Sequence, residues 1–218
     1  MSGFHKVNEN IAGLVSSLGL DISAIELLAV SKTYPVEAIR AVYNEGCRLF
    51  GESRVQEALE KMDGLNGLDD IKFDLIGHLQ TNKARQAVGK FRLIHSVDRL
   101  SLAEELNKYA GKANIIQDIL IQVSLAGEEQ KSGIVPDELD KLFYTTQNMP
   151  SLRIKGFMTI PPYDEDAEKS RPYFKELKRL FDKYQKDSQD ITVLSLGMSG
   201  DYHVAIEEGA TLVRVGTA

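Results

Sequence analysis

The chain has 218 residues, 43% hydrophobic and 27% charged, so it is long enough to bury a sizeable core. Its 26 basic and 32 acidic residues give a net charge of −6 without any basic block, which disfavours nucleic acid and anionic membranes as partners. The single cysteine excludes an internal disulfide, and no apolar run approaches the roughly 18 residues of a membrane helix. With no signal-peptide pattern at the N-terminus, a cytoplasmic location is expected.

The elements predicted from apolar spacing begin with an amphipathic helix over residues 3–18, closed by Gly19. Short apolar runs typical of strands follow at residues 26–31, 48–51, 73–77, 92–96, 117–124, 153–159, 191–196 and 211–215. Helical segments separate these runs, at residues 35–45, 53–62, 81–89, 98–110, 136–148, 164–186 and 201–208. The pattern is therefore one of strands alternating with helices.

Eight strands separated by helices indicate an α/β protein with parallel pairing through right-handed crossovers. A closed (β/α)8 barrel, the TIM-barrel fold, is favoured because it leaves no open sheet edge. An open doubly wound sheet is the alternative, although no Gly-x-Gly-x-x-Gly follows the first strand. No linker divides the chain, so one domain is expected over residues 1–218, with an extra N-terminal helix and no helix after the last strand.

The turns after the last two predicted strands carry the pattern of a phosphate site. Met198 and Ser199 follow the seventh strand between glycines, and Gly216 and Thr217 follow the eighth. Each turn offers backbone N–H groups, a hydroxyl and little side-chain bulk, which suits an anion. In eight-stranded α/β barrels the loops after strands 7 and 8 frequently bind phosphate.

Lys32 lies directly after the first predicted strand, at the end that faces the functional rim of a barrel. Apolar neighbours would disfavour the charged ammonium, and a neutral amine forms Schiff bases with aldehydes. A lysine that simply ends a strand and points into water is the alternative. A Schiff-base lysine opposite a phosphate turn indicates pyridoxal 5′-phosphate (PLP). Arg214, on the eighth strand, could meet the pyridine nitrogen of PLP and keep it unprotonated, or could pair with a carboxylate inside the barrel.

Segments matching one known family run nearly from end to end of the chain. They are Ala29–Thr33, Phe50–Glu52, Val55–Glu57, Ile76–Lys83, Ser96–Asp98, Lys131–Gly133, Gly156–Pro161, Gly197–Ser199, Asp201 and Arg214–Ala218. In these segments the chain resembles the pyridoxal phosphate homeostasis protein family, whose single barrel is similar to the N-terminal domain of alanine racemase. The resemblance implies a PLP-binding TIM barrel that influences the supply of PLP, with no established catalytic turnover.

The resemblance also implies which residues contact the cofactor. Lys32 matches the Schiff-base lysine and Arg214 the arginine beside the pyridine nitrogen, while Ser53 stands where the family commonly has asparagine. The complete set of expected cofactor-binding residues is Lys32, Ser53, Met198, Ser199, Arg214, Gly216 and Thr217. No catalytic residue and no metal ligand is expected, since the four histidines show no metal-ligand spacing.

A PLP-dependent amino-acid racemase or decarboxylase is the main alternative function. Two-base racemisation needs a second acid/base group, which in alanine racemase comes from a partner subunit with an extra β domain. This chain is too short to hold that domain, and an unprotonated pyridine gives little help to carbanion chemistry. A Schiff-base aldolase usually carries its lysine on a later strand. We therefore expect a monomeric PLP carrier or regulator, with PLP-dependent apo-enzymes as candidate partners.

Two other residues are expected to be structural. Cys47, beside the second predicted strand, is interpreted as a buried thiol rather than a nucleophile. His78 ends the third strand at the functional rim, where a hydrogen-bonded structural role is favoured over proton transfer.

Overall fold

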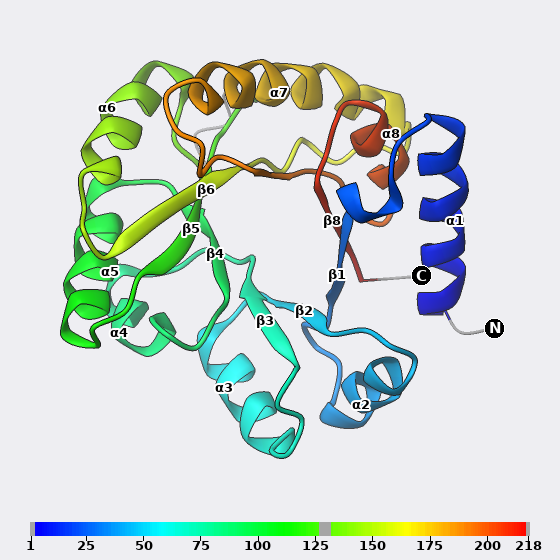
Figure 1. The fold of residues 1–218 in the computed structure, drawn as a ribbon, viewed down its shortest axis with the longest axis horizontal. Coiled ribbons are helices and arrows are strands. Elements are labelled where there is room, and N and C mark those ends of the chain that lie inside the picture. The colour runs from blue at the N-terminus through cyan, green and yellow to red at the C-terminus, as the bar shows by residue number, and fades with distance from the viewer. Residues whose placement is uncertain (1–2, 127–131, 217–218) are drawn as a thin grey trace.

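Eight parallel strands close into a barrel in the computed structural model, which describes residues 3–126 and 132–216. Each strand pairs with the next along the chain, and the eighth pairs with the first, so the predicted TIM barrel is confirmed (Figure 1). The strands are β1 (Glu26–Val30), β2 (Leu49–Glu52), β3 (Lys72–Leu75), β4 (Leu93–Val97), β5 (Gln117–Gln122), β6 (Leu152–Met158), β7 (Val193–Ser195) and β8 (Leu212–Val215). Each forms where the sequence predicts an apolar run.

Helices surround the barrel on its outer side (Figure 1). They are α1 (Gly3–Ser17), α2 (Val36–Asn44), α3 (Val55–Gly64), α4 (Ala84–Ala87), α5 (Leu100–Lys112), α6 (Pro136–Gln147), α7 (Arg171–Gln185) and α8 (Tyr202–Glu207). The extra N-terminal helix α1 lies beside α8 and buries Val7, Ile11 and Val15 in the outer core. Within the described residues no helix follows β8, and none is long and apolar enough to cross a bilayer.

Two helices differ from their predicted extents. The segment predicted over 81–89 divides into a 3-10 turn, η2 (Thr81–Lys83), and the short α4. The segment predicted from residue 164 becomes helical only at η3 (Ala167–Ser170), before α7 begins. Pro172 in the first turn of α7 explains this start, since proline lacks the N–H and fits only the first turn of a helix.

Side chains fill the inside of the barrel. Successive residues of a strand point alternately inward and outward, so the outward residues pack under the helices and the inward ones meet each other. Two apolar clusters are separate from the outer core: Leu28, Leu49 and Leu212, and Leu93, Leu120 and Met158. The rest of the interior is polar and holds Asp74, His95, Ser195 and Arg214, all buried.

Cys47 is buried beside β2, as predicted, and its thiol donates to the Leu49 carbonyl oxygen at 3.3 Å. Burial raises the pKa of this thiol to about 11, since the surroundings disfavour the thiolate. Cys47 is therefore a structural thiol.

Candidate functional site

Lys32 and the loop after β8 lie at the same mouth of the barrel. Lys32 follows β1, and Gly216 follows β8, the strand paired with β1. A Cβ atom on Gly216 would lie 3.1 Å from Val30 Cβ, a tight contact, so glycine lets the chain leave β8 close beside the end of β1. Lys32 is exposed, so its amine is open to a ligand arriving from solvent.

The turn after β7 is held by Asp201. Gly197 has a φ of +79°, which favours glycine, and the Met198 N–H donates to Asp201 Oδ1 at 2.6 Å. The other oxygen of Asp201 accepts a hydrogen bond from Ser170 Oγ at 2.8 Å. The Met198 N–H is therefore engaged, contrary to the expectation that the turn leaves its N–H groups free.

A direct hydrogen bond joins this turn to the loop after β8. The Gly216 N–H donates to Ser199 Oγ at 3.2 Å, so two of the residues expected to hold phosphate touch each other. Thr217, also expected there, lies outside the described residues. This hydrogen bond holds the two predicted phosphate loops against each other, beside the end of β1.

Arg214 points into the barrel and is buried, with 3% of its surface exposed. Its Nη1 donates to the carbonyl oxygen and to Oγ of Ser195, at 2.9 and 2.6 Å, and its Nη2 donates to the Thr159 carbonyl oxygen at 2.9 Å. Burial lowers the pKa of the guanidinium to about 10, which leaves it charged at neutral pH. Among the described residues no carboxylate forms a salt bridge with Arg214, so the alternative of a direct ion pair in the barrel is not observed.

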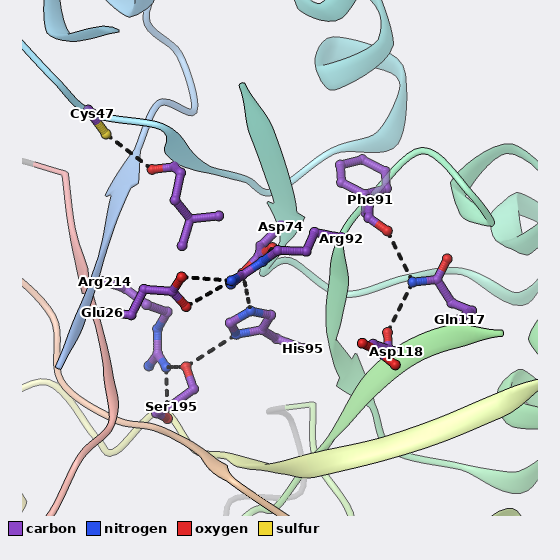
Figure 2. Close-up of polar contacts among 11 residues, drawn as sticks. Glu26, Cys47, Asp74, Phe91, Arg92, His95, Gln117, Asp118, Ser195 and Arg214 are labelled. Atoms are coloured by element: carbon purple, nitrogen blue, oxygen red, sulfur yellow. Dashed lines mark hydrogen bonds and ion pairs between the residues drawn. The ribbon is translucent and has the colours of Figure 1, made fainter. Parts of the chain in front are cut away.

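A network of polar side chains extends from Arg214 to the opposite mouth (Figure 2). We call it the interior network: Glu26, Arg92, Asp74, His95, Ser195 and Arg214. His95 Nδ1 lies 3.2 Å from Ser195 Oγ, and His95 Nε2 lies 3.0 Å from Asp74 Oδ2. Arg92 donates to Asp74 through Nε and Nη2, at 2.8 and 2.6 Å, and to Glu26 through Nη1 at 2.7 Å.

The charge states within the interior network follow from burial and hydrogen bonding. Burial alone would raise the pKa of Asp74, but the bonds from Arg92 and His95 outweigh it and place that pKa below its ordinary value. Burial lowers the pKa of His95, despite the bond to Asp74, so its imidazole is neutral at pH 7. Asp74 is thus ionised beside a neutral histidine.

A second buried cluster supports the segment that contains Lys32. Lys61 Nζ donates at 2.7 Å to three acceptors: Glu52 Oε1, Glu57 Oε1 and the Ser31 carbonyl oxygen. Burial raises the pKa of Glu52, whose Oε2 has no hydrogen-bond partner within the described part of the chain. The cluster fixes the residue immediately before Lys32.

The residue after Lys32 is held by the same cluster. The Thr33 N–H donates to Glu57 Oε1 at 2.7 Å, and Thr33 has a φ of +68°, in the left-handed region that a threonine rarely occupies. Sequence reasoning missed this support. The i, i+4 spacing of Glu57 and Lys61, next to an acidic residue at the end of an apolar strand, was the signal that could have indicated it.

Two further residues lie at this mouth. Ser53 follows β2, and its carbonyl oxygen would be 2.1 Å from a Cβ on Gly77, so the loop after β3 can approach Ser53 only because residue 77 is glycine. His78 is exposed, with Nδ1 3.1 Å from Ser132 Oγ and 3.8 Å from Asp98 Oδ2. The hydrogen bond to Ser132 is the kind of contact that the predicted structural role of His78 needs.

The groups at this mouth match PLP in their chemistry. An exposed amine suits an aldehyde, the glycine and serine of the two joined loops suit a phosphate, and a buried guanidinium suits a ring nitrogen. Gly216 carries no side chain that could stand between a ligand and the backbone of this loop. The residues present therefore fit the cofactor.

Comparison with known proteins places the chain among PLP-related barrels. The family described as "Alanine racemase, N-terminal domain" matches residues 5–218. The chain is 47% identical to the pyridoxal phosphate homeostasis protein of Aquifex aeolicus over 213 residues, covering 97% of this chain and 93% of the relative. It is 35% identical to the protein of the same name from Escherichia coli K12, covering 98% and 92%.

Two solved structures share the fold of this chain. PipY of Synechococcus elongatus PCC7942, solved with PLP bound, superimposes with a TM-score of 0.84 at 38% identity, covering 95% of this chain and 98% of PipY. Alanine racemase from Bartonella henselae has a TM-score of 0.70 at 19% identity, with 99% of this chain matched to 58% of the racemase. At that identity the likeness to the racemase concerns the fold alone.

Proposed function

Because this chain belongs to the pyridoxal phosphate homeostasis protein family, we propose that it binds PLP and takes part in PLP homeostasis as a carrier or regulator without catalytic turnover. One observation carries the proposal. The exposed amine of Lys32 and the joined loops after β7 and β8 lie at the same barrel mouth, with the buried guanidinium of Arg214 projecting inside the barrel beneath them. PipY, which shares this fold at 38% identity, has been solved with PLP bound.

Each proposed contact follows from the chemistry of the side chain. When bound, PLP supplies an aldehyde that condenses with an amine, and Lys32 offers that amine in a segment fixed on both sides by Lys61 and Glu57. Ser199 and the loop at Gly216 would bind the phosphate, together with Met198 and Thr217. Arg214 would face the ring nitrogen and keep it unprotonated, because it carries a permanent charge and offers only donors. Ser53 would contact the ring from the loop after β2.

The first prediction separates a carrier from the alternative racemase or decarboxylase. We expect purified protein to bind PLP, seen as a new absorption band on titration, and to produce no D-alanine from L-alanine above background. The reason is that two-base racemisation needs a second acid/base group on the face of the cofactor opposite Lys32, and a ring nitrogen kept unprotonated by Arg214 gives little help to a carbanion. D-alanine formation, or carbon dioxide release from an amino acid, that is lost in Lys32→Ala would contradict the carrier. Absence of PLP binding would remove the proposed function altogether.

A second prediction concerns the phosphate loops. Ser199→Ala removes the hydroxyl that joins the turn after β7 to the Gly216 N–H. We expect it to raise the dissociation constant for PLP by roughly 10-fold, as for a lost hydrogen bond to a charged group. Titration with pyridoxal, which lacks the phosphate, is the control: its affinity should be equal in the two proteins. A Ser199→Ala protein that binds PLP as tightly as the original would place the phosphate elsewhere.

We also propose that the protein is cytoplasmic and monomeric and that its single domain comprises residues 1–218. In this proposal it exchanges PLP with PLP-dependent apo-enzymes. The open position of Lys32 at the mouth supports exchange, since a partner can approach the amine from solvent. The buried, unpaired Cys47 agrees with a reducing compartment.

A further inference from the structure

From Arg214 to Asp74, the hydrogen bonds of the interior network all run in one direction. An ionised carboxylate only accepts, so His95 must donate to Asp74 through Nε2, which leaves Nδ1 as an acceptor. Nδ1 then accepts the hydroxyl hydrogen of Ser195, and the oxygen of that hydroxyl accepts from Arg214 Nη1. Every group from Arg214 to Asp74 therefore has a fixed donor or acceptor role, and the tautomer of His95 is set.

The network also explains how a charged arginine is tolerated inside the barrel. The acceptors that Arg214 contacts, on Ser195 and Thr159, are uncharged, and a buried charge without compensation is costly. The ionised Asp74 lies three hydrogen bonds away from Arg214, through Ser195 and His95 (Figure 2). Arg92 keeps Asp74 ionised and is itself balanced by Glu26, so the whole network has two acidic and two basic groups around a neutral imidazole.

We propose that His95 and Ser195 are positioning residues for Arg214: they fix the direction of its guanidinium toward the ring nitrogen of PLP. This inference rests on the proposed function, since it assigns a task to residues that would not touch the cofactor. Ser195 binds Nη1 through two oxygens and Thr159 binds Nη2, so the guanidinium cannot rotate without breaking these bonds. Without the Ser195 hydroxyl, Arg214 loses one of these three hydrogen bonds, and the chain of hydrogen bonds from Arg214 to Asp74 is broken.

The main test is Ser195→Ala, which keeps the Ser195 carbonyl contact and removes only the hydroxyl. The readouts are the dissociation constant for PLP and the ¹⁵N chemical shift of the ring nitrogen in ¹⁵N-labelled PLP bound to the protein. We expect the dissociation constant to rise about 5-fold, as for a partly lost charge-assisted hydrogen bond, and the ¹⁵N signal to move. Ser17→Ala, which makes the same substitution on the exposed surface of α1, is the matched control and should change neither readout.

A double-variant comparison shows whether Ser195 acts through Arg214. In an Arg214→Gln background, Ser195→Ala should have no further effect on the dissociation constant. His95→Gln, whose amide can supply the same donor and acceptor, should bind PLP more tightly than His95→Leu. An unchanged ¹⁵N shift in Ser195→Ala, or an equal loss of affinity in the Arg214→Gln background, would overturn the inference. If the unsubstituted protein binds PLP and the variants of Ser195 and His95 have the same dissociation constant and ¹⁵N shift, the positioning role of these residues is wrong while PLP binding stands.

Discussion

Lys32→Ala is expected to abolish the covalent attachment of PLP. Borohydride reduces a Schiff base to a stable secondary amine, so the original protein, loaded with PLP and reduced, should gain the mass of one reduced cofactor on the peptide that contains Lys32. The variant lacks the only amine proposed to reach the aldehyde and should gain none. Mass spectrometry of the intact protein and of its peptides provides the measurement.

The variant should remain folded, because the Lys32 side chain is exposed while the segment around it is held by Lys61 and Glu57. Lys83→Ala is a matched control, since Lys83 belongs to the loop after β3 at the same mouth. This control should take up the cofactor mass on the same peptide as the original protein. A mass gain at another lysine, or an unchanged gain in Lys32→Ala, would remove Lys32 from its proposed role.

Lys61→Met should cause the largest loss of stability among the variants considered, about 3–5 kcal/mol in the free energy of unfolding. The lysine side chain is 8% exposed and that of Glu52 is fully buried, so the substitution leaves the carboxylate of Glu52 without a compensating charge. Denaturation in urea measures the loss. Burial raises the pKa of Glu52, so at low pH this carboxyl is neutral and the missing lysine costs little. As the pH rises from about 5 to 8 the carboxyl is ionised in the unfolded state, so the loss of unfolding free energy in Lys61→Met should grow.

Two companion variants make this prediction specific. Lys178 and Asp182 form an i, i+4 pair on the surface of α7, with 37% and 49% of their side chains exposed, so Lys178→Met should cost less than about 0.5 kcal/mol. The double variant Glu52→Gln, Lys61→Met removes both charges and should recover much of the loss. Equal losses for Lys61→Met and Lys178→Met would mean that the buried cluster does not stabilise the mouth.

The fold and the mouth residues could be predicted because they depend on local pattern. Each strand forms on a short, mainly apolar run, and the residues that end such runs, Lys32, Ser53, Gly197 and Gly216, lie at one mouth once the strands are parallel. The starts of helices were less predictable. Charged residues from 164 onward fit a helix in isolation, whereas Pro172 and the Asp166 side chain, which accepts from Glu168 N–H, set the actual start.

The interior network could not be predicted from the sequence. His95 and Ser195 are 100 residues apart and meet only because β4 and β7 face each other across a closed barrel. Lys61 reaches Ser31 across 30 residues in the same way, from a helix back to a strand end. Polar residues within strands indicate that polar side chains form hydrogen bonds inside the barrel. Which of these side chains meet depends on how the barrel closes and on the irregular register between β4 and β5.

The filled interior of the barrel decides how a small molecule reaches and leaves the proposed site. Leu28 and Leu212 are inaccessible to solvent, as are His95 and Ser195, so these four side chains fill the barrel between its two mouths. Within the described part of the chain, a small molecule beside Lys32 therefore has the filled interior behind it and the mouth in front of it. Delivery of PLP to an acceptor enzyme would then require that enzyme to face this mouth, and covering the mouth would slow both entry and release.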